Sequence, residues 1–372
     1  MSSATPLAVV VPDLSVGGLQ GMAVDLIAAL DPDEFAPHVY SFDAGGPLEE
    51  RLAELEVPHV HMPRAHGVAP GYARELGERF SADGIQLVHC HNVTALFHGA
   101  RAAWRAGRVP VLFTEHDREM PAPWKHRILH RWLARRVTRT VAVSAGLARD
   151  LTRFEGFPAA RTSSRVNGIP DPQLRALPDR AAARAELGWD ERPVILAVGN
   201  LTPVKNHLGF LKVFDRVAQA LNGEVRFVLA GSGPLHDGIR AAADALPAGD
   251  VELLGRRDDV ARLLAAANVF VLPSHREGLP LSLVEAHAME RPSVCWDVGG
   301  NGEVTVANST GFLIDYGDEE AYAARLLELL RDADLATRMG AAARERFTEH
   351  FTHAAMVADY VEHYRQLLGA RV

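Results

Sequence analysis

Residues 276–286 decide the fold of this chain and read Arg276-Glu277-Gly278-Leu279-Pro280-Leu281-Ser282-Leu283-Val284-Glu285-Ala286. They follow a short, continuous apolar run that ends at a proline and is typical of a buried parallel strand, Val269-Phe270-Val271-Leu272. Pro280 suits the first turn of a helix, because a backbone N–H is not needed there. The stretch therefore predicts a strand, a loop that carries Glu277 and a helix that carries Glu285.

Such a strand, loop and helix can form a ligand site. The unpaired N–H groups at the start of a helix favour a phosphate. Beside it, Glu277 can accept hydrogen bonds from a sugar and Glu285 from a ribose. Two glutamates at this spacing also occur by chance on the surface of a helix. The phosphate and sugar site is therefore a hypothesis that needs support from the rest of the chain.

Length and composition limit the class of protein. The 372 residues suit two domains. A net charge of -8 argues against a general nucleic-acid binder. Cys90 and Cys295 lie in different halves, which implies neither a disulfide framework nor a cysteine zinc site and fits a reducing cytoplasm. No apolar run reaches the length that spans a membrane.

Apolar strand-like runs alternate with helical patterns along the whole chain. The predicted strands are 7–11, 38–42, 85–90, 109–114 and 139–144 in the first half, then 193–199, 225–230, 251–254, 269–273, 292–296 and 311–315. This alternation predicts an α/β protein with two Rossmann-like, doubly wound domains, whose ligands bind at the carboxyl ends of the strands. A breaker-rich segment between 167 and 178 predicts the hinge.

A second candidate site follows the predicted strand 193–199. Lys205 lies close to the start of the next predicted helix, where a positive charge is unfavourable unless an anion also binds. Lysine is rare in this chain and arginine is common, so a lysine here suggests a compact point charge for a diphosphate. The alternative is an ordinary exposed lysine.

In the first half, Gly17 and Gly18 follow the first predicted strand and open a helix, which is the position of a phosphate-binding turn. The glycines at 17, 18 and 21 depart from the G-x-G-x-x-G spacing of a dinucleotide site, and a purely structural turn is the alternative. His116 ends a later strand at the same edge of the sheet, with His89 and His91 ending the strand before it. These histidines could reach a ligand between the domains or be structural.

These motifs resemble retaining glycosyltransferases of family 4, which have the GT-B fold. The resemblance also rests on other segments and covers nearly the whole chain: Thr114-Glu115-His116-Asp117-Arg118, Ala142-Val143-Ser144, Gly231-Ser232-Gly233-Pro234, Gly255-Arg256-Arg257-Asp258-Asp259 and Cys295 to Glu303. It implies two Rossmann-like domains with the ligand cleft between them. The acceptor domain would span 1–172 with a returning C-terminal helix at 353–372, and the nucleotide-sugar donor domain 173–352.

The resemblance also implies roles for individual residues. Lys205 would hold the diphosphate, Glu277 the sugar, and His116 would lie beside the donor sugar and the acceptor. Asn200 stands where the family usually has Arg, so the diphosphate would depend more on Lys205. No cofactor and no bound metal are expected. The full donor-binding set would be Gly17, Gly18, Asn200, Lys205, Arg257, Glu277, Gly278, Leu279, Pro280, Leu281 and Glu285.

The implied activity is a retaining, Leloir-type hexosyl transfer from a nucleotide sugar to an acceptor hydroxyl. The acceptor would be a sugar or a lipid-linked sugar in bacterial cell-surface polysaccharide or glycolipid assembly, with no nucleic acid involved. Two alternatives remain: a GT-B sugar-nucleotide epimerase, and a catalytically inactive partner that binds a sugar nucleotide, for which Asn200 is the support.

One segment stands out by charge. From Met120 to Arg149 there is no Asp or Glu, but there are Lys125, Arg127, Arg131, Arg135, Arg136, Arg139 and Arg149. If 124–136 is helical, Ile128, Leu129, Trp132 and Leu133 share one face, with basic residues around its edge. The segment is either a helix with a solvated basic face, or a peripheral docking site for anionic lipid on the inner face of the membrane of a cytoplasmic protein.

Overall fold

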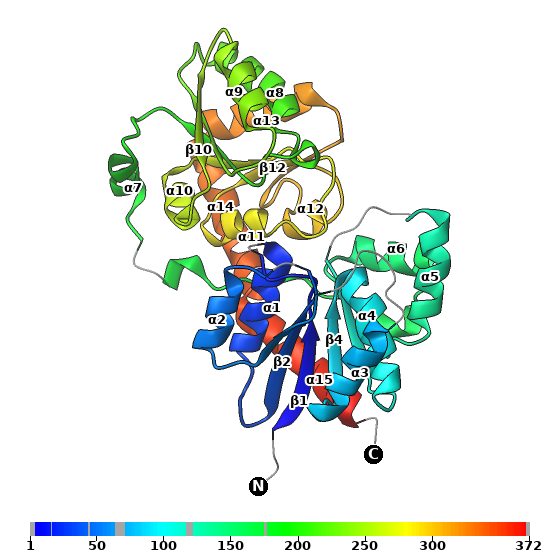
Figure 1. Ribbon diagram of the computed structural model, residues 1–372. Coiled ribbons are helices and arrows are strands. Elements are labelled where there is room, and N and C mark those ends of the chain that lie inside the picture. Colours follow the sequence, from blue (N-terminus) through cyan, green and yellow to red (C-terminus); the bar gives the residue numbers. More distant parts are fainter. Residues whose placement is uncertain are drawn as a thin grey trace. The chain divides into compact units, whose positions relative to one another are not determined.

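The computed structural model describes residues 4–15, 17–43, 45–63, 71–116, 122–174 and 177–369. The chain folds into two compact units (Figure 1). Unit 1 comprises Met1–Asn167 and Ala354–Val372, and unit 2 comprises Gly168–His353. This division falls a few residues before the boundary at 172 that the sequence predicts.

Unit 1 is built on a seven-stranded parallel sheet of order β3-β2-β1-β4-β5-β6-β7. The strands are β1 Thr5–Val10, β2 Phe35–Ser41, β3 His59–His61, β4 Leu87–His91, β5 Val111–Glu115, β6 Arg139–Ala142 and β7 Thr162–Ser164. The helices are α1 Gly18–Ala28, α2 Leu48–Glu54, α3 Tyr72–Ala82, α4 Asn92–Arg105, α5 Trp124–Ala134, α6 Ala145–Glu155 and α15 His353–Gly369, with a 3-10 turn η1 at Ala159–Arg161.

Helices cover both faces of this sheet (Figure 1). Because side chains alternate along a strand, Val9 packs in the core that holds α1 and α15, while Val10 lies against Gly99 of α4. The C-terminal helix α15 contributes Met356, Tyr360, Tyr364 and Leu367 to that core. The sheet therefore buries the side chains from Leu7 to Val10 in β1, which explains the continuous apolar sequence there.

Unit 2 repeats the plan with a six-stranded parallel sheet of order β10-β9-β8-β11-β12-β13. Its strands are β8 Val194–Val198, β9 Arg226–Ala230, β10 Asp250–Gly255, β11 Val269–Leu272, β12 Ser293–Trp296 and β13 Gly311–Ile314. Its helices are α7 Arg180–Leu187, α8 His207–Ala220, α9 His236–Asp244, α10 Val260–Ala266, α11 Leu281–Ala288, α12 Asn301–Val304, α13 Glu319–Arg331 and α14 Ala333–His350, with 3-10 turns η2 Pro172–Leu174 and η3 Pro203–Lys205.

Each of the predicted strands is present, but the sequence missed β3 and β7. Both are three-residue strands at the edges of the unit 1 sheet. Their sequences, His-Val-His and Thr-Ser-Ser, lack the apolar run that marks a buried strand, and neither strand is fully buried. Edge strands need little apolar surface, so apolar periodicity does not find them.

Candidate functional site

The carboxyl edge of the unit 2 sheet brings Lys205 and Glu277 into direct contact. Lys205 is the last residue of η3, which follows β8. Glu277 lies in the loop between β11 and α11, and β11 is the neighbour of β8 in the sheet. The Lys205 Nζ donates to Glu277 Oε1 at 2.6 Å, with side chains 24% and 8% exposed. Two residues to which the sequence gave separate roles thus form one partly buried ion pair.

Two hydrogen bonds to main-chain carbonyl groups join the two loops that carry this pair. The His275 N–H donates to the Val204 carbonyl at 2.8 Å. The Asn206 side-chain amide donates to the Pro273 carbonyl at 3.2 Å, while Asn206 itself adopts a left-handed φ of 54° and precedes the first turn of α8. Asparagine tolerates this conformation better than most residues. The ion pair is therefore held by main-chain geometry as well as by its own charges.

A third loop, between β12 and α12, contacts the backbone of Glu277. The Gly300 N–H donates to the Glu277 carbonyl at 3.3 Å. A Cβ on Gly299 would stand 1.9 Å from the Glu277 carbonyl oxygen, and one on Gly300 would stand 2.0 Å from that of Gly278. Gly299 also has a left-handed φ of 54°. The resemblance includes these glycines only within the segment Cys295 to Glu303 and gives neither a role of its own, although two adjacent glycines in the loop after a strand are a signal of close backbone approach.

Helix α11 begins beside this pair. Pro280 occupies its N-cap position, and among the described residues no side chain caps its first N–H groups. Gly278, Leu279 and Pro280 are buried, whereas Leu281, the first residue of the helix, is partly exposed. An uncapped helix start next to a lysine ammonium is an environment that favours a phosphate.

Glu285 lies on α11, one turn after Leu281. Its side chain is partly exposed, but burial among neighbouring atoms raises the pKa of the carboxyl group to about 7. Desolvation disfavours the charged form, so a ligand that donates hydrogen bonds to this carboxylate would favour ionisation. The ionised carboxylate of Glu285 can accept hydrogen bonds from hydroxyl groups, and this ionisation requires loss of a proton near neutral pH.

Asn200 and Arg257 lie in other loops of the same sheet edge. Asn200 is exposed directly after β8, and its carbonyl accepts from the Thr202 N–H at 2.9 Å. Arg257 follows β10 and makes two 2.7 Å hydrogen bonds to Asp259. This pairing lowers the pKa of the Asp259 carboxyl and raises that of Arg257. A neighbouring carboxylate thus compensates the charge of Arg257, as Glu277 compensates that of Lys205.

In unit 1, Gly17 and Gly18 open α1 at the carboxyl end of β1. Gly17 is the N-cap and Gly18 the first helical residue, and both are exposed. Within the part of the chain that is described, no side chain caps this helix either. A Cβ on Gly17 would stand 2.6 Å from Gln20 Oε1. This turn is a second helix start without a described side-chain cap, and it can accept an anion.

The three histidines predicted at the unit 1 sheet edge form a buried chain. His91 Nδ1 and His116 Nε2 are 3.1 Å apart, and their rings stack. The His89 ring bonds to the Thr114 hydroxyl and to the Tyr364 hydroxyl of α15, each at 2.8 Å. His89 thus has a structural role, joining the sheet to the last helix.

Burial keeps these imidazoles uncharged. It lowers the pKa of His116 to about 3 and those of His89 and His91 well below their usual value. His116 therefore acts at neutral pH as a hydrogen-bonding group and not as a cation. Asp117 and Arg118, which complete the motif in the sequence, lie outside the described residues.

Family models match both halves of the chain. The model for Glycosyltransferase Family 4 matches residues 16–171, and the model for Glycosyl transferases group 1 matches residues 179–346. The alpha-maltose-1-phosphate synthase of Mycolicibacterium smegmatis is 31% identical over 90% of this chain and 97% of its own. The chain belongs to glycosyltransferase family 4.

Two further comparisons support this family and its fold. The N-acetyl-alpha-D-glucosaminyl L-malate synthase of Bacillus anthracis is 31% identical over 86% of this glycosyltransferase and 79% of its own chain. The crystal structure of Anabaena HepE in complex with UDP and glucose aligns with a TM-score of 0.85 at 19% identity, over 97% of this chain and 100% of HepE. The expected GT-B fold and glycosyltransferase activity are confirmed, and neither alternative function is favoured.

Several other sequence motifs have structural roles in this glycosyltransferase. Ser144 caps α6, accepting from the Leu147 N–H at 3.2 Å. Asp332 caps α14 in the same way, at 2.8 Å from the Leu335 nitrogen. Over the described ranges, no group of three or more His, Cys, Asp or Glu side chains is arranged to hold a metal ion.

None of the helices among the described residues combines the length and the apolar character needed to cross a bilayer.

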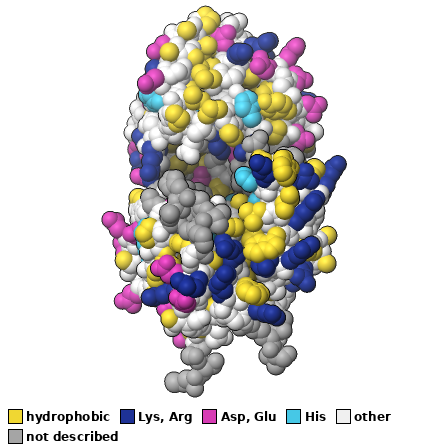
Figure 2. Space-filling model, turned by 45° about the vertical axis from the view of Figure 1, so that its right-hand side comes forward, with side chains coloured by type: hydrophobic (Ala, Val, Ile, Leu, Met, Phe, Trp, Pro, Cys, Tyr) yellow, Lys and Arg dark blue, Asp and Glu magenta, His cyan; other side chains and the backbone are white. Residues whose placement is uncertain are grey.

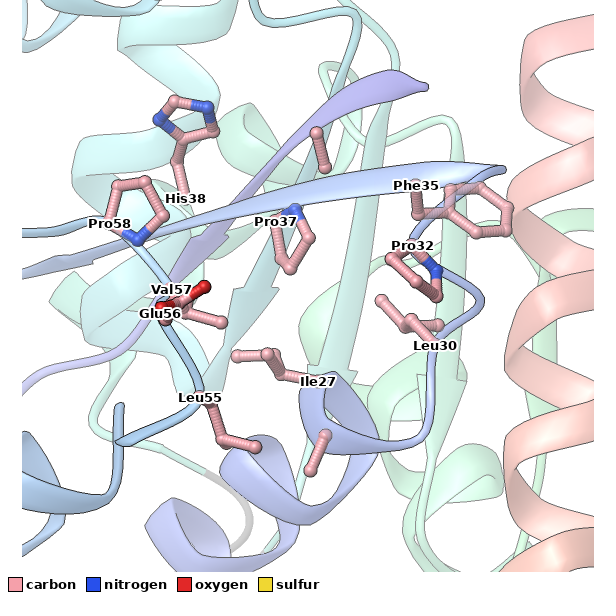
Figure 3. A pocket seen from close by; sticks show the side chains of 12 residues that line it. Ile27, Leu30, Pro32, Phe35, Pro37, His38, Leu55, Glu56, Val57 and Pro58 are labelled. Carbon is pink, nitrogen blue, oxygen red and sulfur yellow. The ribbon is translucent and has the colours of Figure 1, made fainter. Parts of the chain in front are cut away.

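A pocket of about 460 Å³ in unit 1 is lined by the end of α1, the start of β2 and the segment after α2 (Figure 3). It lies at the amino end of β2 and therefore at the opposite edge of the sheet from Gly17 and His116, so we assign it no part in the reaction.

Proposed function

We propose that this glycosyltransferase moves a hexose from a nucleotide sugar to an acceptor hydroxyl with retention of the anomeric configuration. The observation that carries the proposal is the Lys205–Glu277 pair at 2.6 Å beside the uncapped start of α11. A fixed cation and free N–H groups stabilise a departing diphosphate, and a carboxylate next to them can hold the hydroxyls of the sugar.

In this proposal the donor binds to the carboxyl edge of the unit 2 sheet. Lys205 and the start of α11 hold the diphosphate. Glu277 and the backbone N–H groups of Gly278 and Leu279 hold the sugar, and Glu285 accepts from the ribose. Gly17, Gly18, Asn200 and Arg257 would add contacts to phosphates or base. His116, neutral and hydrogen-bonded to His91, would accept from or donate to a sugar hydroxyl.

The proposed reaction breaks the bond between the anomeric carbon and the diphosphate oxygen and forms one to the acceptor oxygen on the same face. The proton of the acceptor hydroxyl passes to the departing phosphate. Positive charge develops on the sugar and negative charge on the diphosphate, so the fixed charge of Lys205 stabilises the transition state more than the ground state. Exclusion of water would protect the donor from hydrolysis.

We also propose that the transfer needs no divalent metal. The support is chemical: Lys205 and the start of α11 supply the positive potential that a metal would otherwise give a diphosphate. Turnover should therefore persist in excess EDTA after dialysis. Loss of turnover in EDTA, restored by added Mg²⁺ or Mn²⁺, would contradict this part of the proposal.

For the acceptor and the location, we propose a sugar or lipid-linked sugar in the cytoplasm. Cys90 and Cys295 are free and buried, as suits a reducing compartment. The relatives named above make small glycosides or glycosyl phosphates, while others are mannosyltransferases of phosphatidylinositol mannosides. Assembly of a bacterial cell-surface glycolipid or polysaccharide is the context we propose for this chain.

The experiment is a thermal-shift screen of UDP-, GDP- and ADP-sugars, followed by assays of nucleoside diphosphate release with a panel of acceptors. Transfer predicts release that depends on both the stabilising donor and an acceptor, together with a new glycoside. Release without any acceptor, with a free epimerised sugar, would favour the epimerase. Donor binding with no turnover on any acceptor would favour the inactive partner.

A further inference from the structure

Unit 1 carries a concentration of positive charge that the transfer chemistry does not use. Between residues 84 and 149 the sequence has eleven Lys and Arg and three acids, Glu115, Asp117 and Glu119, in a chain of net charge -8. Glu115 is buried and so adds little to the surface. The surface formed by α4 and α5 is therefore strongly basic.

Helix α5 exposes an apolar stripe on this basic surface. Trp124, Ile128 and Trp132 are 67%, 60% and 37% exposed, and their spacing of four residues places them on one side of the helix. The opposite side, with His130, Leu133 and Ala134, is buried in unit 1. The sequence grouped Ile128 and Trp132 with Leu133 on one face, and the structure corrects this, because Leu133 faces the core and the other two face solvent.

Basic side chains flank the stripe. The Lys125 ammonium lies 5.7 Å from the Trp124 ring centre, and the Arg136 guanidinium lies 3.5 Å from that of Trp132. Arg131 on α5 and Arg135 at its C-terminal end are also exposed. Arg127 differs, because its side chain donates to the Phe154 carbonyl at 3.0 Å and so fastens α5 to α6. The surface charges of interest are thus Lys125, Arg131, Arg135 and Arg136.

A cationic pocket of about 360 Å³ continues this surface at the end of α5. Three arginines, Arg108, Arg135 and Arg136, line it together with Trp104, and no carboxylate is among its described lining residues. Burial, with the nearby charges of Arg101 and Arg135, lowers the pKa of Arg136. Three arginine side chains around one hollow create a positive potential that favours an anion.

We propose that the exposed side of α5, with the arginine pocket at its end, is a docking surface for an anionic lipid bilayer. Tryptophans and an aliphatic residue along one side of a helix, flanked by Lys and Arg, match the interface between headgroups and acyl chains. The pocket then receives a headgroup phosphate. Figure 2 turns this side forward and shows apolar side chains set among Lys and Arg, while the visible acidic side chains of unit 1 lie on its other side.

Docking along α5 would bring the reaction edge of unit 1 to the lipid surface. Trp124 starts the helix that follows β5, so it lies toward the carboxyl edge of the sheet, which also carries His116. Arg135 and Arg136 lie at the other end of the helix. With α5 lying flat in the interface, both ends of the helix lie close to the bilayer, and so does the edge of the sheet at its Trp124 end. Lipid binding of this kind does not depend on the proposed transfer.

The test is co-sedimentation of the full chain with vesicles, either phosphatidylcholine alone or an equimolar mixture with phosphatidylglycerol. We expect binding to the mixed vesicles at low salt, weakened by added salt, and little binding to phosphatidylcholine. Each basic residue at an anionic surface contributes about fivefold, so the variant Lys125→Glu/Arg131→Glu/Arg135→Glu should lose about a hundredfold or more in partitioning. The matched control, Lys212→Glu/Arg216→Glu/Arg338→Glu, changes exposed residues of unit 2 and should retain far more of the binding.

A second pair of variants tests insertion. Trp124→Ala/Ile128→Ala should weaken binding to the mixed vesicles, whereas Leu55→Ala/Leu174→Ala, which also shortens exposed apolar side chains, should not. Tryptophan fluorescence of the wild type should be quenched by brominated lipid. Circular dichroism and melting temperature check that each variant is folded. Equal binding to both kinds of vesicle, no binding to either, or equal losses in the α5 and control variants would overturn the proposal.

Discussion

At the scale of residues, the proposed transfer depends on one contact. The Lys205 ammonium lies 2.6 Å from the Glu277 carboxylate, and the side chains are 24% and 8% exposed. Because both groups are partly buried, removing one leaves the other without its compensating charge. Single substitutions therefore report lost stability as well as lost function, and melting curves must accompany kinetics.

We predict that Lys205→Ala lowers kcat by more than about a hundredfold, since one preorganised charge at a leaving group contributes roughly 3 kcal/mol. Steady-state kinetics at saturating donor measures this, with Lys212→Ala as the control because Lys212 is an exposed lysine of α8. A folded Lys205→Ala enzyme with nearly normal kcat would show that Lys205 has no catalytic role.

From the raised pKa of Glu285 we predict that donor affinity depends on pH. Its pKa is raised to about 7, so the free enzyme holds a proton there below that pH, and ribose hydroxyls favour the ionised form. Nucleotide binding should therefore tighten as pH rises from about 6 to about 8. Titration calorimetry across this range should show the trend in the wild type and a weaker, flatter profile in Glu285→Gln. The same slope in both proteins would assign the titration to another group.

The raised pKa also fixes the sign of the effect on folding. The carboxyl group has a higher pKa in the folded chain than when unfolded, so the folded state binds its proton more tightly. Its contribution therefore favours folding at low pH and is lost as pH rises through about 7. The gain in donor affinity with pH is thus not a secondary effect of a more stable fold.

At the scale of elements, loops after neighbouring strands build the site. Apolar periodicity predicted the strands that carry these loops, because buried parallel strands are continuous apolar runs. It missed β3 and β7, whose short, polar sequences need no burial. It also missed Gly299 and Gly300, because their role depends on backbone from a different loop.

Gly299→Ala tests that loop contact. A Cβ there would stand 1.9 Å from the Glu277 carbonyl oxygen on a backbone with a φ of 54°. We expect the loop to shift, at a stability cost of roughly 1 to 3 kcal/mol, and kcat to fall with it. Thermal melting and kinetics measure both effects. Gly238→Ala in α9 is the control, since its added Cβ meets no described atom within 4 Å and should be neutral or stabilising. Equal behaviour of the two variants would contradict the supporting role of Gly299.

At the scale of the whole molecule, the sequence predicted both Rossmann-like halves but not the pairing of their side chains. Lys205 and Glu277 are 72 residues apart, and their contact follows from β8 and β11 being neighbours in the sheet. His89 and Tyr364 are 275 residues apart and meet because α15 packs on the unit 1 sheet. Spacing along a chain carries no information on such contacts, so the sequence gave each residue a separate role.

The anomeric configuration of the first product tests the proposed retaining transfer most directly. An isotopically labelled donor and an accepted acceptor are mixed with the enzyme, and the coupling constant of the product's anomeric proton is followed by NMR. Retaining transfer predicts a glycoside with the donor's configuration from the earliest time points, with the Lys205→Ala reaction far slower. A product of inverted configuration, or donor consumed without any glycoside, would contradict the account.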